Sequence, residues 1–142
     1  MLQKSFVAIK PTAVKRGLIG RILQRFEDKQ YKVVAMKMLI PTKEQGEQHY
    51  EEHKDKPFFE ELVAYITSGP IVAMVIEGEE AILGIRKLIG ATDPLQADAG
   101  TVRADFAQYK RYNMIHAADC VDSAEREIAI YFDKEDFCNY EL

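Results

Sequence analysis

The sequence alternates between two kinds of hydrophobic pattern, and this alternation limits the fold more than any other feature. Short continuous apolar runs, typical of buried strands, stand between segments whose apolar residues recur every three or four positions, as on one face of a helix. The runs that predict strands cover residues 6–9, 31–40, 71–76 and 113–116. The helical segments cover residues 14–26, 42–53, 57–66, 81–88 and 122–132. We therefore expect strands and helices that share one core.

Capping and breaking residues mark several boundaries of these elements. Pro11 closes the first strand, because proline has no amide hydrogen to give to a sheet. Thr42 and Gln45 have the spacing of a capping box, and Asp122 or Ser123 can cap the last helix. The order of elements fits a βαββαβ unit, with helices packed on one face of the sheet and a helical insertion between the second and third strands. The pattern does not decide which strands are neighbours.

Two segments follow neither hydrophobic pattern. Residues 90–112 have no clear period and predict a long irregular loop before the last strand. Loops of this length are uncommon in compact domains and usually have a function. The final residues, 133–142, read as a polar tail.

Length, charge and cysteine content narrow the class of protein. The 142 residues are enough for one domain, spanning residues 1–142. A net charge of −4 argues against a broad basic face for nucleic acid, and no apolar run is long enough to cross a membrane. The apolar part of the first stretch, MLQKSFVAIKP, is too short and too soon interrupted by charge to predict a signal peptide, so we expect a cytoplasmic protein. Cys120 and Cys138 are too few and too far apart for a disulfide framework and read as reduced thiols.

The sequence contains neither of the common glycine-rich phosphate-binding loops. If the chain binds phosphates, it must therefore use side chains. Lys10 lies at a predicted strand end, Arg86 on a predicted helix and Arg103 in the irregular segment. Each of them alone reads as an ordinary surface charge.

Two of the three histidines are four residues apart on a charged helical segment. His49 and His53 would share one helix face and could in principle hold a metal ion. Tyr50, however, stands where a zinc-protease motif would have its glutamate directly after the first histidine. We therefore interpret the pair as part of a solvated helix face.

The third histidine, His116, ends the last predicted strand, after the long irregular segment. Reactive groups are often placed at strand ends beside long loops. The helix that follows carries Glu127. A buried structural histidine and a reactive one are both compatible with this local sequence.

Several separated motifs give the chain a resemblance to a known family. They are FVAIKPTAVKRGLIGRI, HYEEHKDKPFFEELVAYITSGPIVAMVIEG, RKLIGATDP, GTVRADF and NMIHAADCVDSAEREIAIYF. In this order and spacing, the chain resembles a nucleoside diphosphate kinase along nearly its whole length. Its expected fold is then α/β (α+β): a ferredoxin-like βαββαβ single domain with an antiparallel four-stranded sheet.

The resemblance implies a reaction. It predicts that His116 takes the terminal phosphoryl group from a nucleoside triphosphate and passes it to a diphosphate, in a ping-pong cycle through a phosphohistidine. It assigns Glu127 to the second ring nitrogen of His116, where a carboxylate would fix the tautomer. An unperturbed imidazole is largely neutral at cytoplasmic pH, so its other nitrogen keeps a lone pair for attack.

The resemblance also assigns the residues that hold the nucleotide. Lys10, Arg86 and Arg103 would bind the phosphates, since phosphoryl transfer requires cations on oxygens that share negative charge. Thr92 would add a hydroxyl to the same phosphates, and Asn113 would contact the sugar and phosphate end. Two aromatic residues complete the expected site: Tyr50 near the catalytic ring and Lys10, and Phe58 stacked on the base.

Further expectations concern selectivity, metal and assembly. Stacking uses a π-face common to all bases and therefore predicts weak base specificity. Mg²⁺ would arrive with the nucleotide, with ATP as donor, and not in a protein cage. The family assembles as tetramers or hexamers, so we expect a homo-oligomer.

The chain departs from the family pattern at three places. Ala117 and Ala118 replace the Gly-Ser that commonly follows the histidine, so a serine hydroxyl that would help to hold Glu127 is absent. Residues 110–112, Lys-Arg-Tyr, replace Val-Gly-Arg and add cations near the base site, and Ala99 replaces a loop proline. These changes leave open a binding module without turnover, and the pair of histidines leaves open a metal-dependent hydrolase.

Overall fold

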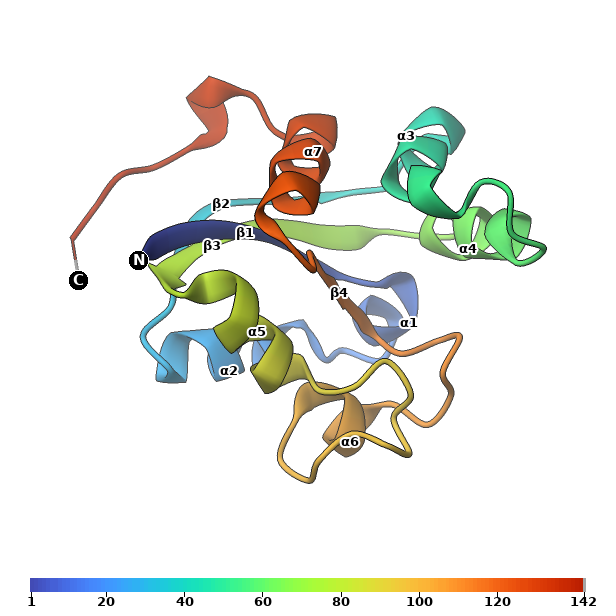
Figure 1. Cartoon of the computed structure of the whole chain (residues 1–142), viewed down its shortest axis with the longest axis horizontal. Coiled ribbons are helices and arrows are strands. Elements are labelled where there is room, and N and C mark those ends of the chain that lie inside the picture. Colours follow the sequence, from blue (N-terminus) through green and yellow to red (C-terminus); the bar gives the residue numbers. More distant parts are fainter. Residues whose placement is uncertain (142) are drawn as a thin grey trace.

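A computed structural model describes residues 1–141 and contains a four-stranded antiparallel sheet (Figure 1). The strands are β1 (Leu2–Ile9), β2 (Lys32–Leu39), β3 (Ile71–Glu79) and β4 (Ile115–Ala117), in the order β2-β3-β1-β4. All three neighbouring pairs are antiparallel. The predicted ferredoxin-like sheet is confirmed, and β1 and β3 extend beyond the apolar runs that predicted them.

Helices cover both faces of this sheet, so the prediction that they pack on one face is wrong. On one face lie α2 (Ile19–Asp28) and α5 (Ala81–Ile89), which pack on Val7 and Ile9 of β1. The other face, with Phe6 and Ala8, is covered by three helices. These are α3 (Lys43–His49), α4 (Phe59–Ile66) and α7 (Val121–Tyr131), with α3 and α7 above the strands in Figure 1.

The prediction of one covered face was wrong because successive side chains of β1 pack into two different apolar cores. In a strand, successive side chains point to opposite faces. Phe6, Val7, Ala8 and Ile9 are all fully buried, two on each side. A continuous apolar run therefore indicates burial on both faces, which the helices of a single βαββαβ unit cannot supply. The insertion and α7 cover the second face.

The first predicted helix, residues 14–26, is two helices in the structure. They are α1 (Pro11–Lys15) and α2, and the chain turns between them at Gly17. Gly17 has φ of +72°, a left-handed conformation that glycine adopts without steric cost. The apolar spacing continued across the turn because Leu18 packs into the same core as α2.

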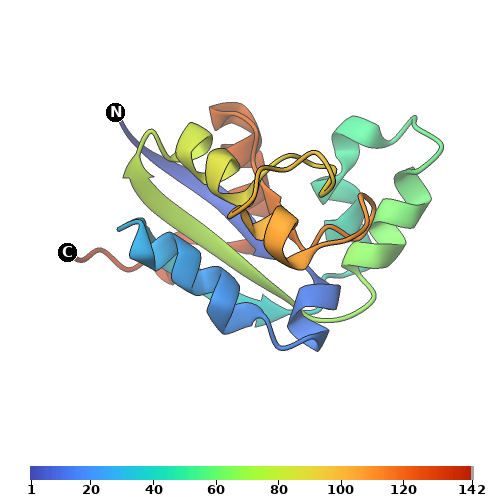
Figure 2. The ribbon, with the colours of Figure 1, turned by 90° about the horizontal axis from the view of Figure 1, so that it is seen from below.

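The irregular segment contains one short helix that the periodicity did not predict, α6 (Val102–Phe106). The Thr101 side chain caps it by accepting a hydrogen bond from the amide of Ala104, at 3.3 Å. Five residues are too few to establish a helical period. The α6 helix packs near α5, and Figure 2 shows the long loop that joins the two helices.

The chain near its C-terminus also differs from the prediction. Cys120, and not Asp122 or Ser123, caps α7: its sulfur accepts a hydrogen bond from the amide of Ser123. The predicted polar tail contains the 3-10 turn η2 (Lys134–Asp136) and then runs beside β2, where the amide of Cys138 donates to the carbonyl of Val34 at 2.7 Å.

The remaining element is the 3-10 turn η1 (Glu51–His53), which continues the chain after α3. The capping box predicted at the start of α3 is present, since Thr42 and Gln45 bond to each other's backbone amides. No helix within residues 1–141 has the length and apolar character needed to cross a membrane.

Candidate active site

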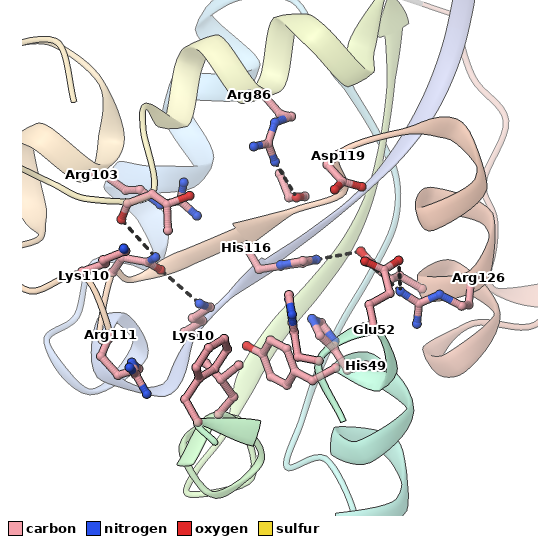
Figure 3. A pocket seen from close by; sticks show the side chains of 18 residues that line it. Lys10, His49, Glu52, Arg86, Arg103, Lys110, Arg111, His116, Asp119 and Arg126 are labelled. Carbon is pink, nitrogen blue, oxygen red and sulfur yellow. Dashed lines mark hydrogen bonds and ion pairs between the residues drawn. The ribbon is translucent and has the colours of Figure 1, made fainter. Parts of the chain in front are cut away.

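A pocket of about 420 Å³ opens where β1, β4, α3, α5, α7 and the 90–113 segment meet. Figure 3 shows the side chains of Lys10, Arg86 and Arg103 gathered around His116. All the residues that the sequence proposed for the site, as catalytic or nucleotide-binding, line this one pocket. They are Lys10, Tyr50, Phe58, Arg86, Thr92, Arg103, Asn113, His116 and Glu127.

His116 lies in β4, opposite Ala8 of β1. Its neighbours Ile115 and Ala117 point into the core, so the alternation of the strand directs His116 to the pocket. The side chain is 21% exposed. A fully buried structural histidine, the alternative that the sequence left open, does not fit this exposure.

A carboxylate fixes the orientation of the His116 ring. The Nε2 atom of His116 lies 2.7 Å from Oε1 of Glu127, on α7. When Nε2 carries the proton it donates to Glu127, and the second ring nitrogen, Nδ1, then keeps its lone pair. No partner for Nδ1 is found within residues 1–141. This nitrogen is the nucleophile that the site offers.

The surroundings of His116 favour its neutral form. Burial lowers the pKa of His116 well below its ordinary value of 6.5, and the positive charges of Lys10, Arg103 and Arg86 lower it further. Burial also raises the pKa of Glu127, to about 7. At neutral pH the imidazole is therefore uncharged and able to attack an electrophile.

Lys10 follows β1 and stands at the N-cap of α1, where its backbone amide bonds to the carbonyl of Met114. Its Nζ donates to Oδ1 of Asn113 at 3.0 Å. Burial, together with the charge of Arg103, lowers the pKa of Lys10 to about 7. An anion in the pocket would restore the proton to this amine.

Backbone carbonyls hold the two arginines. Arg103 of α6 donates to the carbonyls of Gly90 and Ile115, at 2.9 and 2.8 Å, and is 5% exposed. Arg86 of α5 donates to the carbonyl of Ala117 at 3.4 Å. Neither guanidinium has a carboxylate partner within residues 1–141, so both keep charge available for an anion. The sequence reading of each as a surface charge is therefore wrong.

Asn113 and Thr92 connect the irregular segment to this cluster of cations. Asn113 is buried, and its Nδ2 donates to the backbone carbonyl of Thr92 at 3.3 Å. Its amide oxygen is the acceptor for Lys10. One amide therefore ties Lys10 to the loop that carries Thr92.

Phe58 lies at the mouth of the pocket and Phe59 packs against the core. The guanidinium of Arg111 lies 5.1 Å from the centre of the Phe58 ring, and the amine of Lys56 lies 5.7 Å from it. Arg111 and Lys110 line the same mouth, as their departure from the family pattern suggested. Arg111 is also paired with Glu61 at 2.7 Å.

His49 is buried, so the interpretation of the histidine pair as a solvated helix face is wrong for this residue. Its Nδ1 bonds to the hydroxyl of Tyr131 at 3.1 Å, and its ring centre lies 4.4 Å from that of His116. The ring also packs against that of Phe6 of β1, with centres 5.8 Å apart. Gly46 lets α3 lie close to α4, because a Cβ there would come within 2.9 Å of a neighbouring side chain.

Tyr50 is buried beside His49, with ring centres 4.7 Å apart, and its hydroxyl has no partner within residues 1–141. His53 is half-buried at the pocket rim. No group of three or more potential metal ligands occurs among the described residues. The metal-site hypothesis for His49 and His53 therefore gains no support.

Several residues of the pocket were not found by sequence reasoning. They are His49 as a neighbour of His116, and Glu52, Leu62, Asp119 and Arg126. The spacing of Gly46, His49 and Tyr50 at i, i+3 and i+4 was the available signal for His49, since these positions share a helix face. Glu52 and Arg126 are charged residues on helical segments, and such residues are normally exposed.

The sequence matches the family model described as nucleoside diphosphate kinase over residues 3–137. Two relatives of that name come from Methanobrevibacter smithii and Saccharolobus solfataricus. The first is 56% identical over 142 residues, which is 100% of this chain and 95% of the relative. The second is 53% identical over 134 residues, which is 94% of this chain and 97% of the relative.

Solved structures agree with the sequence relatives. A halophilic nucleoside diphosphate kinase from Halobacterium salinarum, in complex with CDP, superposes with a TM-score of 0.96 and 44% identity, covering 100% of this chain and 95% of that one. The nucleoside diphosphate kinase of Aquifex aeolicus gives a TM-score of 0.95 and 38% identity, covering 97% and 100%. Over its whole length, therefore, this chain belongs to the nucleoside diphosphate kinase family.

Proposed function

We propose that this protein is a nucleoside diphosphate kinase that reversibly transfers the terminal phosphate of a nucleoside triphosphate to a nucleoside diphosphate. The observation that carries the proposal is the His116–Glu127 pair. A neutral imidazole is bonded through Nε2 to a carboxylate, so that Nδ1 keeps its lone pair in a pocket lined by Lys10, Arg86 and Arg103. Residues 1–142 would act as a single domain of this kind.

The reaction would proceed in two transfer steps through a phosphohistidine on His116. In the first, Nδ1 attacks the terminal phosphorus, the new N–P bond forms, and the bond from phosphorus to the bridging oxygen breaks. The nucleoside diphosphate leaves with that oxygen. In the second, an oxygen of another diphosphate attacks the phosphorus and breaks the N–P bond. In both steps Nε2 keeps its proton and donates a hydrogen bond to the carboxylate of Glu127, which stabilises the positive charge on the ring.

Lys10, Arg86 and Arg103 would hold the phosphates in line with Nδ1. Positioning and charge stabilisation supply most of the catalysis in phosphoryl transfer. The hydroxyl of Thr92 and the amide of Asn113 would add hydrogen bonds at the phosphate and sugar end. Tyr50 also lines the pocket, and its buried hydroxyl has no hydrogen-bond partner within residues 1–141.

Phe58 would stack on the base at the pocket mouth, and this supports weak base specificity. An aromatic face recognises the π-surface that all bases share. Mg²⁺ would bind to the nucleotide phosphates and neutralise part of their charge. This arrangement is supported by the pocket lining, which offers basic side chains to the phosphates.

We also propose a homo-oligomer, tetrameric or hexameric, in the cytoplasm. The free edge of the sheet supports assembly: Met36, Met38 and Ile40 at the end of β2 are exposed, at alternate positions. An exposed apolar edge strand in a soluble protein usually pairs with another chain.

The proposal is tested by measuring the intact mass after incubation with ATP and Mg²⁺ in the absence of an acceptor. We expect a gain of one phosphoryl group, located on the peptide that contains His116 and lost in acid. The His116→Asn variant should gain none. GDP, CDP and dTDP should each discharge the phosphorylated protein at similar rates.

The same assay separates the two remaining hypotheses. A protein that binds ADP but gains no phosphoryl group would be a binding module without turnover. Label that persists in the His116→Asn variant would contradict the assignment of the nucleophile.

A further inference from the structure

The carboxylate that holds His116 has a second oxygen, and the structure shows what contacts it. Oε1 of Glu127 faces His116, whereas Oε2 lies 3.5 Å from Nη2 of Arg126. Ala118 offers no hydroxyl at the position where a serine was expected to help. Within residues 1–141, Arg126 is the one Lys or Arg side chain within 4.0 Å of Glu127.

Arg126 is itself fixed by a different part of the fold. Its Nη1 donates to the carbonyl of Gln48 on α3 at 2.8 Å. Its Nη2 donates to Oε1 of Glu52 on η1 at 3.2 Å, and Figure 3 shows the side chains of Arg126 and Glu52 next to each other. The hydroxyl of Ser123 donates to the same Glu52 oxygen, also at 3.2 Å. Arg126 therefore connects the helix that carries Glu127 to the helical insertion.

These contacts distinguish Arg126 from an ordinary surface ion pair. Exposed pairs contribute little, because water screens both charges. Here one partner, the side chain of Glu127, is only 5% exposed, and the planar guanidinium bonds to a carbonyl and two carboxylates at once. A buried carboxylate keeps its charge only when cations or donors compensate for lost hydration.

We propose that Arg126, anchored by Gln48 and Glu52, is a positioning residue that holds the Glu127 carboxylate against the nucleophilic histidine. The inference rests on the proposed function, since it concerns the partner of the reacting ring. Arg126 does not need to touch the nucleotide. It acts through Glu127 by fixing the direction of the carboxylate and by favouring its ionised form.

This role predicts a change in pH dependence as well as in rate. Burial raises the pKa of Glu127 to about 7, and positive charge on His49 and on Arg126 opposes that rise. The ionised carboxylate accepts the hydrogen bond from Nε2 of His116 more strongly than the neutral acid does, and it stabilises positive charge on the ring. Phosphorylation should therefore slow as the pH falls through this pKa. The groups that face Glu127 and share in its titration are His116, His49, Glu52, Asp119 and Arg126.

The test is single-turnover phosphorylation by ATP across pH, followed by quenching and intact-mass measurement. For Arg126→Met we expect a rate about tenfold or more below wild type at neutral pH, as for loss of groups that orient a reactive side chain. The pH midpoint of the acid limb of the rate profile should also rise by about one unit. Arg126→Lys keeps the positive charge but loses the planar guanidinium, which bonds to several partners at once. The pH midpoint of its acid limb should therefore stay near that of wild type, while its phosphorylation rate is only partly restored.

Lys32→Met is the matched control. Lys32 begins β2 and, like Arg126, bonds to a carboxylate and a carbonyl: that of Glu77, at 3.4 Å, and that of Tyr140. None of these three residues lines the pocket. This variant should leave the phosphorylation rate and its pH profile unchanged. Glu52→Ala should give part of the Arg126→Met defect, and no further loss when the two changes are combined.

The outcomes separate this inference from the proposed function. If wild type gains no phosphoryl group, the function itself fails. If wild type is phosphorylated and Arg126→Met has the same rate and acid limb, the positioning role is wrong. It is also wrong if Arg126→Met slows the rate without moving the limb, because a purely structural loss would do the same.

Discussion

The buried cation Lys10 shows how the site prepares for an anion at the scale of single residues. Its amine is surrounded by protein and lies close to Arg103, so its pKa falls to about 7. In the free protein a large share of Lys10 is therefore neutral at neutral pH. Polyphosphate in the pocket would favour the charged amine, and the pKa would return toward its ordinary value of 10.5.

We therefore expect nucleotide binding to take up protons above pH 7. At about pH 8 the uptake should reach up to about one proton per site, because a neutral Lys10 becomes charged in the complex. Below the lowered pKa the amine is already charged, and its contribution to the uptake should vanish. Calorimetric titration with ADP in buffers of different ionisation enthalpy measures this quantity.

Lys10→Met is the variant that tests the assignment. It should bind ADP more weakly and lose most of the proton uptake at about pH 8. An uptake that is unchanged in this variant would mean that another group, such as Glu127, takes up the proton.

At the scale of elements, the turn between α1 and α2 depends on one glycine. Gly17 has a positive φ and no atoms near the position of a Cβ, so strain and not crowding would decide the effect of a side chain. Gly20 has equally open surroundings but lies inside α2. The two positions therefore separate backbone conformation from packing.

Gly17→Ala should lower the free energy of unfolding by about 1 to 2 kcal/mol, the cost of a left-handed conformation for a residue with a Cβ. Gly20→Ala should raise it by about 0.5 to 1 kcal/mol, since alanine favours a helix. Urea denaturation of both variants measures the difference. Equal effects of the two substitutions would show that the φ of Gly17 does not limit stability.

At the scale of the whole molecule, the two edges of the sheet differ. At one edge the short β4 carries His116. At the other edge, the chain near Cys138 covers the start of β2 but leaves Met36, Met38 and Ile40 exposed. The free edge is thus separated from the edge that carries the proposed nucleophile, and assembly through it would leave the pocket open.

The Met38→Lys variant tests assembly through this edge. A charged side chain there should weaken pairing between chains, so the molar mass from light scattering should fall toward that of one chain. The circular dichroism spectrum should not change, because Met38 is exposed in the single chain. A wild-type mass equal to one chain would contradict the proposed oligomer, and an unchanged mass in the variant would exclude this edge as the contact.

The types and the order of the main elements could be predicted from the sequence, because buried residues recur along each segment with the period of its strand or helix. Pro11 and the capping box of Thr42 and Gln45 marked boundaries in the same way, through local backbone chemistry. Separated motifs also indicated which residues belong together, and the pocket contains Lys10 and His116 as expected.

Which face each helix covers, and which residues surround each charge, depends on how the elements pack in three dimensions. The ring of His49 packs against Phe6 of β1 and Tyr131 of α7, and the contacts of Arg126 depend on α3 and α7 lying side by side. Periodicity reports how far a residue is from water, whereas the identity of its neighbours depends on chain segments distant in sequence. For that reason the motifs could predict Glu127 as the partner of His116, whereas the position of Arg126 next to Glu127 could not be predicted.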